Sequence, residues 1–191
     1  MTATTTIKDQ IIDQAQALIQ TRGYNGFSFR DIANEIGIKS SSIHYYYPSK
    51  TELAVAATSK YRSDFMHVAS KLQNNKKKAT TILKNYAELF QQTLKRKQKI
   101  CLVGMLASEF NSVAPEVRAE VKAFFVEQHQ LLTNIIKLGQ TNDEIRPELT
   151  ASDIAKTYLS ALEGAMMLAR TGKDSSDILL VSRQMISMIK T

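Results

Sequence analysis

A short segment near the N-terminus carries lysine, serine, histidine and tyrosine side chains in close succession. All of these side chains can donate hydrogen bonds. Lysine and serine can bind guanine edges or phosphate oxygens, and tyrosine can donate to phosphates or place its ring against thymine methyl groups. The segment is therefore a candidate DNA-contacting surface, and its members are Lys39, Ser40, Ser41, Ser42, His44, Tyr45 and Tyr46.

Three helices are expected within the first fifty residues, and the candidate surface lies on the third. Apolar residues at three- and four-residue spacing predict an amphipathic helix from Ile7 to Arg22. Ser28 stands three residues before Asp31, which predicts reciprocal capping of a second helix that Gly37 ends. A short helix, a glycine-containing turn and a polar helix together form the helix-turn-helix arrangement.

The three consecutive tyrosines allow a second interpretation, since aromatic side chains also fill protein cores. Tyr47 follows Ile43 by four residues, so the two share one helix face and we expect Tyr47 to be buried. Tyr45 and Tyr46 are expected at the surface, because a helix of two turns cannot bury every side.

The rest of the chain also has helical spacing, and no segment alternates with a period of two. With 191 residues, 43% hydrophobic residues, 7 glycines and 3 prolines, the composition excludes collagen-like and low-complexity proteins. We predict an all-α fold with an N-terminal three-helix helix-turn-helix domain at residues 1–50 and a larger helical domain at 51–191. The later helices are expected near residues 49–72, 80–96, 101–110, 115–138, 152–171 and 175–190, with Gly139 and Gly172 as stops and Thr150 with Asp153 as a capping box.

The letters of the first quarter of the chain make the helix-turn-helix interpretation more specific. The residues concerned are Arg22-Gly23-Tyr24, Phe29-Arg30-Asp31-Ile32-Ala33, Gly37-Ile38, Ile43 to Tyr47, Pro48-Ser49-Lys50 and Leu53. They closely resemble the DNA-binding domain of the TetR/AcrR family of bacterial transcriptional regulators, and Cys101 to Gly104 with Ser108 and Glu109 resemble a segment of one branch of that family. His44 departs from the family's usual tyrosine and Tyr47 from its usual phenylalanine.

The resemblance implies a ligand-responsive repressor that binds a palindromic operator as a homodimer and is released by a small-molecule effector. Arg30 and Lys50 would bind phosphates, and the candidate surface would face the major groove. The alternative is a helical small-molecule carrier or interaction module that does not use its helix-turn-helix on DNA, since a fold does not secure a function.

The family fold places the dimer interface on the last two long helices, which carry more apolar surface than two terminal helices can hide alone. The alternative for each of these residues is an ordinary intramolecular core. The expected interface residues are Leu159, Leu162, Met166, Ala169, Leu180, Met185 and Ile189.

The resemblance also implies a small-molecule pocket in the larger domain. Phenylalanine and methionine at helical spacing are core residues first, so the candidates have this second interpretation. The candidate lining residues are Phe65, Met66, Phe90, Met105, Phe110, Phe124, Phe125, His129, Tyr158 and Met167.

The net charge of +7 comes mostly from the middle of the chain, where Tyr61 to Lys99 holds 10 basic and 2 acidic residues. The runs at 76–78 and 95–99 are the densest. Such a positive field can attract nucleic acid or an anionic surface, but a solvated loop and a solvated helix end give the same pattern.

The chemistry of a metalloprotein or an enzyme is not indicated. The single cysteine, Cys101, suits a reducing compartment, and it is either a buried thiol or an electrophile sensor near Lys97 and Lys99. No catalytic motif, metal-ligand spacing or cofactor loop stands out, so we expect no enzyme activity, no metal and no cofactor. No apolar run suits a membrane helix, so an intracellular location is expected. The family resemblance implies the bacterial cytoplasm, with association to the nucleoid when DNA is bound.

Overall fold

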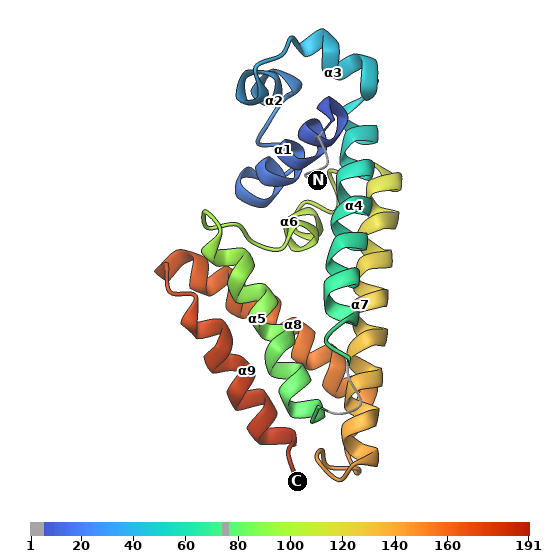
Figure 1. Cartoon of the computed structure of the whole chain (residues 1–191), viewed down its shortest axis with the longest axis vertical. Coiled ribbons are helices and arrows are strands. Elements are labelled where there is room, and N and C mark those ends of the chain that lie inside the picture. The colour runs from blue at the N-terminus through green and yellow to red at the C-terminus, as the bar shows by residue number, and fades with distance from the viewer. Residues whose placement is uncertain (1–5, 74–76) are drawn as a thin grey trace, which may run out of the picture. The chain divides into compact units, whose positions relative to one another are not determined.

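The computed structural model describes residues 6–73 and 77–191, and every regular element in these ranges is an α-helix (Figure 1). This confirms the predicted all-α fold. Residue 76, the first of the basic run 76–78, lies outside the described residues. The helices are α1 (Ile7–Arg22), α2 (Phe29–Ile36), α3 (Ser40–Tyr46), α4 (Lys50–Ser70), α5 (Ala79–Lys95), α6 (Leu102–Ser108), α7 (Pro115–Thr141), α8 (Ala151–Gly172) and α9 (Ser176–Ile189).

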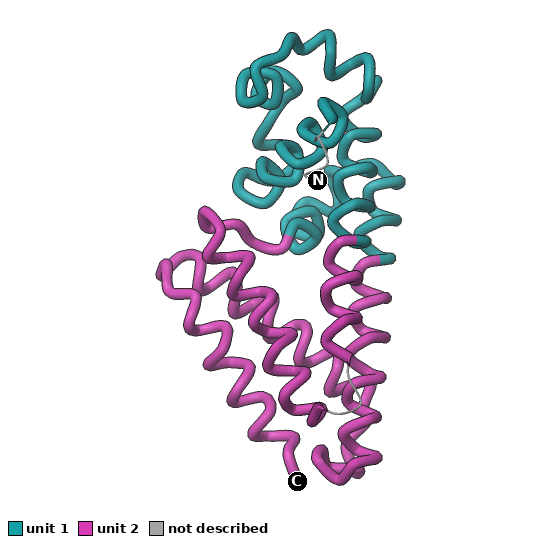
Figure 2. The backbone as a smooth tube through the Cα atoms, viewed as in Figure 1, with its two compact units in different colours: residues 1–63, 102–123 teal, residues 64–101, 124–191 magenta. Residues whose placement is uncertain are grey.

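The chain divides into two compact units (Figure 2). Unit 1 comprises residues 1–63 and 102–123, and unit 2 comprises residues 64–101 and 124–191. Helices α4 and α7 have residues in both units. These units are defined by contacts between residues, not by function, so the functional domains expected at residues 1–50 and 51–191 remain a prediction.

Unit 1 forms around α1, which packs against α2 and α6, while α2 packs against α3. The apolar stripe of α1 is fully buried at Ile11, Ala15 and Ile19, as its spacing predicts. Ile43 of α3 and Leu53 of α4 have no exposed surface and complete the same core. The helix-turn-helix is therefore anchored by apolar side chains on each of its elements.

Unit 2 is built from α5, α8 and α9, which pack against one another, together with parts of α4 and α7. Tyr158 of α8 is fully buried, and its hydroxyl donates to the Leu83 carbonyl at 2.8 Å and lies 2.7 Å from Ser182 Oγ. Burial raises the pKa of Tyr158 well above its ordinary value. The side chain is thus a neutral, hydrogen-bonded core residue that ties α8 to α5 and α9.

Two local predictions for unit 2 were wrong. Helix α7 does not stop at Gly139 but continues to Thr141. The glycine instead permits close packing, since an added Cβ would lie 2.7 Å from Ala79 Cβ and 2.7 Å from Ile145 Cδ1. Thr150 is the N-cap of α8, but its side chain makes no capping hydrogen bond.

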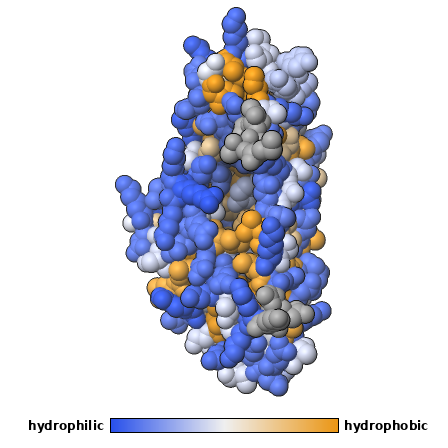
Figure 3. Space-filling model, in the orientation of Figure 1, coloured by the Kyte–Doolittle hydropathy of each residue, from blue (hydrophilic) through white to orange (hydrophobic). Residues whose placement is uncertain are grey.

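Charged and polar residues dominate the face shown in Figure 3, where hydrophobic residues appear in separate patches. None of the helices in the described ranges combines the length and the apolar character that a membrane span requires.

Candidate nucleic-acid interface

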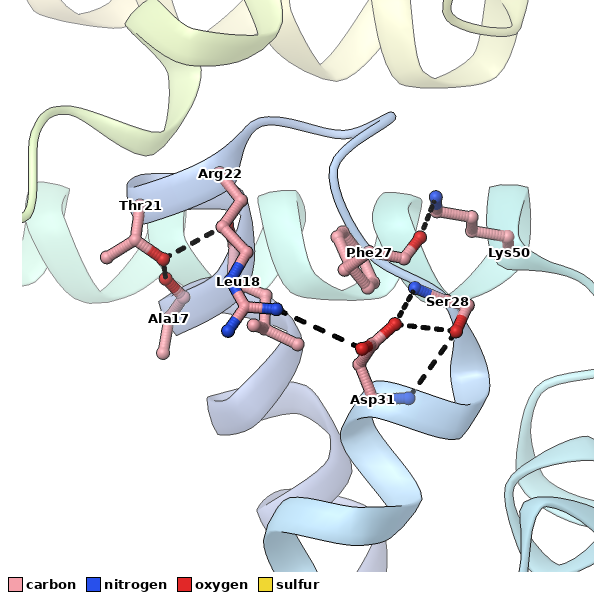
Figure 4. Close-up of polar contacts among 8 residues, drawn as sticks. All are labelled: Ala17, Leu18, Thr21, Arg22, Phe27, Ser28, Asp31 and Lys50. Carbon is pink, nitrogen blue, oxygen red and sulfur yellow. Dashed lines mark hydrogen bonds and ion pairs between the residues drawn. The ribbon is translucent and has the colours of Figure 1, made fainter.

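The start of α2 is fixed by the reciprocal cap that the sequence predicts (Figure 4). The Ser28 backbone N–H and hydroxyl donate to Asp31 Oδ2 at 2.7 and 2.6 Å, and the Asp31 N–H donates back to Ser28 Oγ at 3.4 Å. These bonds hold the pKa of Asp31 below its ordinary value, with help from the charge of Arg22. The cap therefore satisfies two of the free N–H groups at the start of α2, those of Ser28 and Asp31.

The turn between α2 and α3 depends on a left-handed glycine. Gly37 has φ 73° and ψ 34°, a conformation that L side chains rarely adopt, and its N–H bonds to the Ala33 carbonyl. The Ile38 N–H reaches the same carbonyl at 3.0 Å. This tight turn directs the chain from α2 into α3 at a defined angle.

Helix α3 presents the side chains expected to contact DNA. Tyr45 is 83% exposed, and its ring packs edge to face with Tyr46 at 5.1 Å between centroids. The ring of His44 is exposed and packs against Phe29 of α2 at 4.7 Å. Among the other candidates, Arg30, Lys39 and Ser41 are exposed, whereas Ser40, Ser42, Tyr46 and Lys50 are half-buried.

Tyr47 is buried, with 5% of its surface exposed, which confirms the expectation that it joins Ile43 in the core. Its hydroxyl is also buried and has no hydrogen-bond partner among the described residues. Burial and the nearby charge of Asp9 raise the pKa of Tyr47, so the group is neutral. A buried hydroxyl without a partner costs free energy.

Tyr47→Phe is therefore expected to raise the free energy of unfolding by about 1 kcal/mol, because it removes the unpaired hydroxyl and keeps the ring. Urea unfolding followed by circular dichroism measures the change. Tyr86→Phe is the matched comparison, since the Tyr86 hydroxyl donates to Gln128 Oε1 at 2.5 Å and its loss should destabilise. A Tyr47→Phe protein less stable than the parent would contradict the assignment.

Lys50 is held by the turn between α1 and α2. Its Nζ donates to the Phe27 carbonyl at 2.5 Å (Figure 4) and lies 4.6 Å from the Tyr24 ring centroid and 4.3 Å from that of Phe27. Burial lowers the pKa of Lys50, and the charges of Glu109 and Asp31 oppose this. The predicted phosphate contact remains a prediction, but the structure gives the ammonium a positioning role that the sequence did not indicate.

Glu109, just beyond α6, is a further residue that organises this region. Its Oε2 accepts from the Tyr24 N–H at 2.5 Å, and its Oε1 accepts from the Asn25 N–H and side-chain amide at 3.3 and 3.2 Å. Gly23 has φ 83°, and a Cβ there would lie 3.0 Å from the Glu109 carboxylate. Glu109 was noted in the sequence only through the family segment at Ser108 and Glu109, and nothing local indicates its partners.

The candidate pocket residues are divided between the two units. Met105 and Phe110 belong to unit 1, and the other eight belong to unit 2. In unit 2, the Phe65 ring lies 6.0 Å from Phe90 and 5.6 Å from Phe124, forming an aromatic cluster. Phe125 and His129 line a groove, Met66 accepts a hydrogen bond from Gln128, and Tyr158 lies in the core. Met167 is 53% exposed on α8, and its place in a pocket remains a prediction.

Most residues expected at a dimer interface lie instead in the chain's own core. Each of α8 and α9 has an apolar stripe that repeats every three to four residues. This stripe faces α5 and the other of the two helices, so the chain itself already covers it. Leu180 stays 46% exposed, and Met185 is half-buried. The expected interface residues that are buried within the chain are Leu159, Leu162, Met166, Ala169 and Ile189, and their part in a dimer interface remains a prediction.

A different set of apolar side chains faces outward on these two helices. Leu168 is 72% exposed and Met188 is 65% exposed, and Met167 and Leu180 are the other large apolar side chains that are exposed there. We call these four residues the outer apolar face of α8 and α9. Sequence periodicity alone did not separate this face from the inner stripe.

Two stretches of the chain match described protein families. Residues 11–57 match the family described as bacterial regulatory proteins, tetR family. Residues 76–184 match the C-terminal domain described as transcriptional regulator LmrA/YxaF-like.

Individual proteins are also similar. The chain is 24% identical over 196 residues to the HTH-type transcriptional regulator YxaF of Bacillus subtilis strain 168, covering 100% of this chain and 98% of YxaF. A 47-residue stretch, 25% of each protein, is 40% identical to IcaR of Staphylococcus epidermidis, described as a negative transcriptional regulator of the biofilm operon icaADBC. A TetR-family transcriptional regulator from Agrobacterium tumefaciens superimposes with a TM-score of 0.92 at 29% identity, covering 96% of this chain and 97% of that chain.

Proposed function

Because the chain belongs to the TetR family of bacterial transcriptional regulators, we propose that it is a repressor that binds a palindromic operator as a homodimer and is released by a small-molecule effector. The observation that carries the proposal is the exposed polar and aromatic surface of α3, held in place by a capped α2 and a left-handed turn. Repression is supported by the similarity to IcaR, whose description is that of a negative regulator.

The DNA contact is expected to be made by α3 in the major groove. An α-helix fits this groove, which is about 12 Å wide, and its side chains can reach base edges there. Ser41, His44 and Tyr45 are exposed on α3, while Ile43 anchors the helix from behind. Arg30 and Lys39 are exposed cations that can bind the flanking phosphates. A rigid support keeps these side chains in register with the bases.

The homodimer is proposed to form through the outer apolar face of α8 and α9. Large apolar side chains exposed on the surface can mark an interaction site. A closed two-fold dimer pairs the same surface on both chains, which matches a palindrome whose half-sites lie one helical turn, about 34 Å, apart.

The effector is proposed to bind in unit 2, which holds the aromatic cluster around Phe65 and the groove lined by Phe125 and His129. An effector that prefers the DNA-free state a hundredfold shifts the equilibrium by about 2.7 kcal/mol. As a binding protein acting on genomic DNA, the repressor would work in the bacterial cytoplasm and without a catalytic step.

Fluorescence anisotropy with duplexes tiled across the region upstream of the gene tests this function. We expect nanomolar, competitor-resistant binding of two chains to a palindromic duplex, with affinity falling about 10³-fold or more between 50 and 200 mM salt. The salt dependence is expected because Arg30, Lys39 and other cations would release counterions from phosphates. Weak binding that is equal for every duplex would contradict the proposal and favour a carrier or interaction module.

A further inference from the structure

Helices α7 and α8 border a groove of about 600 Å³ within unit 2. This volume suits a small organic molecule, since such sites commonly measure about 300–1,000 Å³. Apolar walls dominate, and four polar side chains are placed along them. The lining residues are Phe125, Val126 and His129 of α7, and Lys156, Leu159, Ser160 and Glu163 of α8.

Glu163 is the unusual member of this lining. Its Oε1 atom is buried and has no hydrogen-bond partner among the residues that the structure describes. The carboxyl group does receive a hydrogen bond from the thiol of Cys101, which is itself buried. Burial raises the pKa of Glu163 to about 7, and the Cys101 hydrogen bond opposes this rise. An acceptor oxygen left unpaired in such a place calls for a donor that residues 6–73 and 77–191 do not provide.

The Tyr86 hydroxyl and the His129 ring, two polar groups of this region, have hydrogen-bond partners other than Glu163. The Tyr86 hydroxyl, close enough for the Glu163 charge to affect its pKa, donates to Gln128. His129 Nε2 lies 3.0 Å from the Ser152 carbonyl. Lys156 precedes Glu163 by seven residues, about 10 Å along the helix, and its side chain is exposed, so its ammonium can stay in solvent.

We propose that this groove binds a small organic cation, a protonated amine on an apolar body, with Glu163 as its counter-ion. The inference rests on the proposed function, because the amine would be the effector. Its N–H would donate to Glu163 Oε1, and its apolar body would cover Phe125 and Leu159. A charge-assisted hydrogen bond in a partly buried site is among the stronger polar contacts a ligand can make.

Calorimetry with a matched pair of probes tests the proposal. The probes are 4-phenylbutylamine and 4-phenylbutan-1-ol, which share a ring and a chain but differ in charge. At pH 8 we expect the parent protein to bind the amine more tightly than the alcohol. Glu163→Gln should weaken amine binding at least about tenfold and change alcohol binding little. Asp153→Asn, which removes an exposed carboxylate from the same helix, is the control and should bind the amine as the parent does.

A pH series gives a second readout. Because Glu163 becomes protonated below pH 7, the parent protein should bind the amine up to about tenfold more weakly at pH 6 than at pH 8. Glu163→Gln should lose most of this dependence, because the amide that replaces the carboxyl group does not titrate in this range. Thermal melting of each variant checks that the fold is intact.

Equal amine affinity in the parent and in Glu163→Gln would overturn the assignment, as would an alcohol that binds as tightly as the amine. Operator binding is measured on the ligand-free protein, so its failure would count against the proposed function and not against the amine site. Release of the operator by the amine in the parent, but not in Glu163→Gln at the same concentration, would support both.

Discussion

Tyr45→Ala is expected to weaken operator binding by about 10- to 100-fold while leaving helicity and melting temperature unchanged. The tyrosine is 83% exposed, and within the described residues its one ring contact is with Tyr46, so its removal costs little packing. Its hydroxyl and ring are free to contact a base edge or a thymine methyl group, and such a base contact discriminates by about 1–3 kcal/mol. Anisotropy titrations with operator and scrambled duplexes measure the loss.

Arg30→Ala distinguishes a phosphate contact from a base contact at the same interface. Its exposed guanidinium lies on the first turn of α2, so its loss should weaken operator and scrambled duplexes alike. The slope of log affinity against log salt should fall by about 1. Tyr45→Ala, in contrast, should reduce the preference for operator over scrambled DNA.

Asn34→Ala serves as the control for both variants, because Asn34 is exposed on α2 but does not belong to the candidate surface. It should bind the operator as the parent does. If Tyr45→Ala also binds as the parent does, α3 is not the reading element, and the assignment of the interface is wrong.

The local features of this interface could be predicted because each depends on residues close in sequence. The Ser28 and Asp31 cap joins residues three positions apart, and Gly37 ends α2 through its own conformational freedom. The burial of Tyr47 follows from its four-residue spacing to Ile43. Helical geometry alone links such positions, so the pattern of residue types in the sequence is enough to predict these features.

Features that depend on distant residues could not be predicted in the same way. Glu109 bonds to Tyr24 and Asn25 across about 84 intervening positions, and a lone glutamate carries no sign of such partners. Helix α8 has apolar side chains on both its inner stripe and its outer face, so periodicity did not show which set the chain covers itself. Gly139 resembled a helix stop because its contact with Ala79 exists only after folding.

Glu109→Ala is expected to lower the free energy of unfolding by about 2–3 kcal/mol, because it leaves the Tyr24 and Asn25 N–H groups without their charged acceptor. Hydrogen bonds to a charged group contribute more than neutral ones, and both carboxylate oxygens are used here. Urea unfolding measures the stability. Hydrogen exchange should show the Tyr24 and Asn25 amides losing protection more than those of α1.

The same variant should also weaken operator binding beyond what reduced stability explains. The turn that Glu109 holds contains Tyr24 and leads to Phe27, and these are the residues against which Lys50 is fixed. Phe27 directly precedes the Ser28 cap that begins α2, so a loosened turn permits α2 and α3 to vary in orientation. We expect a loss of about tenfold in operator affinity at a temperature where the protein is fully folded, since a small misplacement of contacting groups is costly.

Glu116→Ala provides the matched control, since Glu116 is an exposed carboxylate in the same unit and lies in the first turn of α7. It removes the same charge without touching the turn, and stability and operator affinity should both change little. Glu109→Gln keeps one acceptor oxygen and should fall between the parent and Glu109→Ala. Were Glu109→Ala and Glu116→Ala to lose operator affinity equally, the effect would come from net charge, and the positioning role of Glu109 would be refuted.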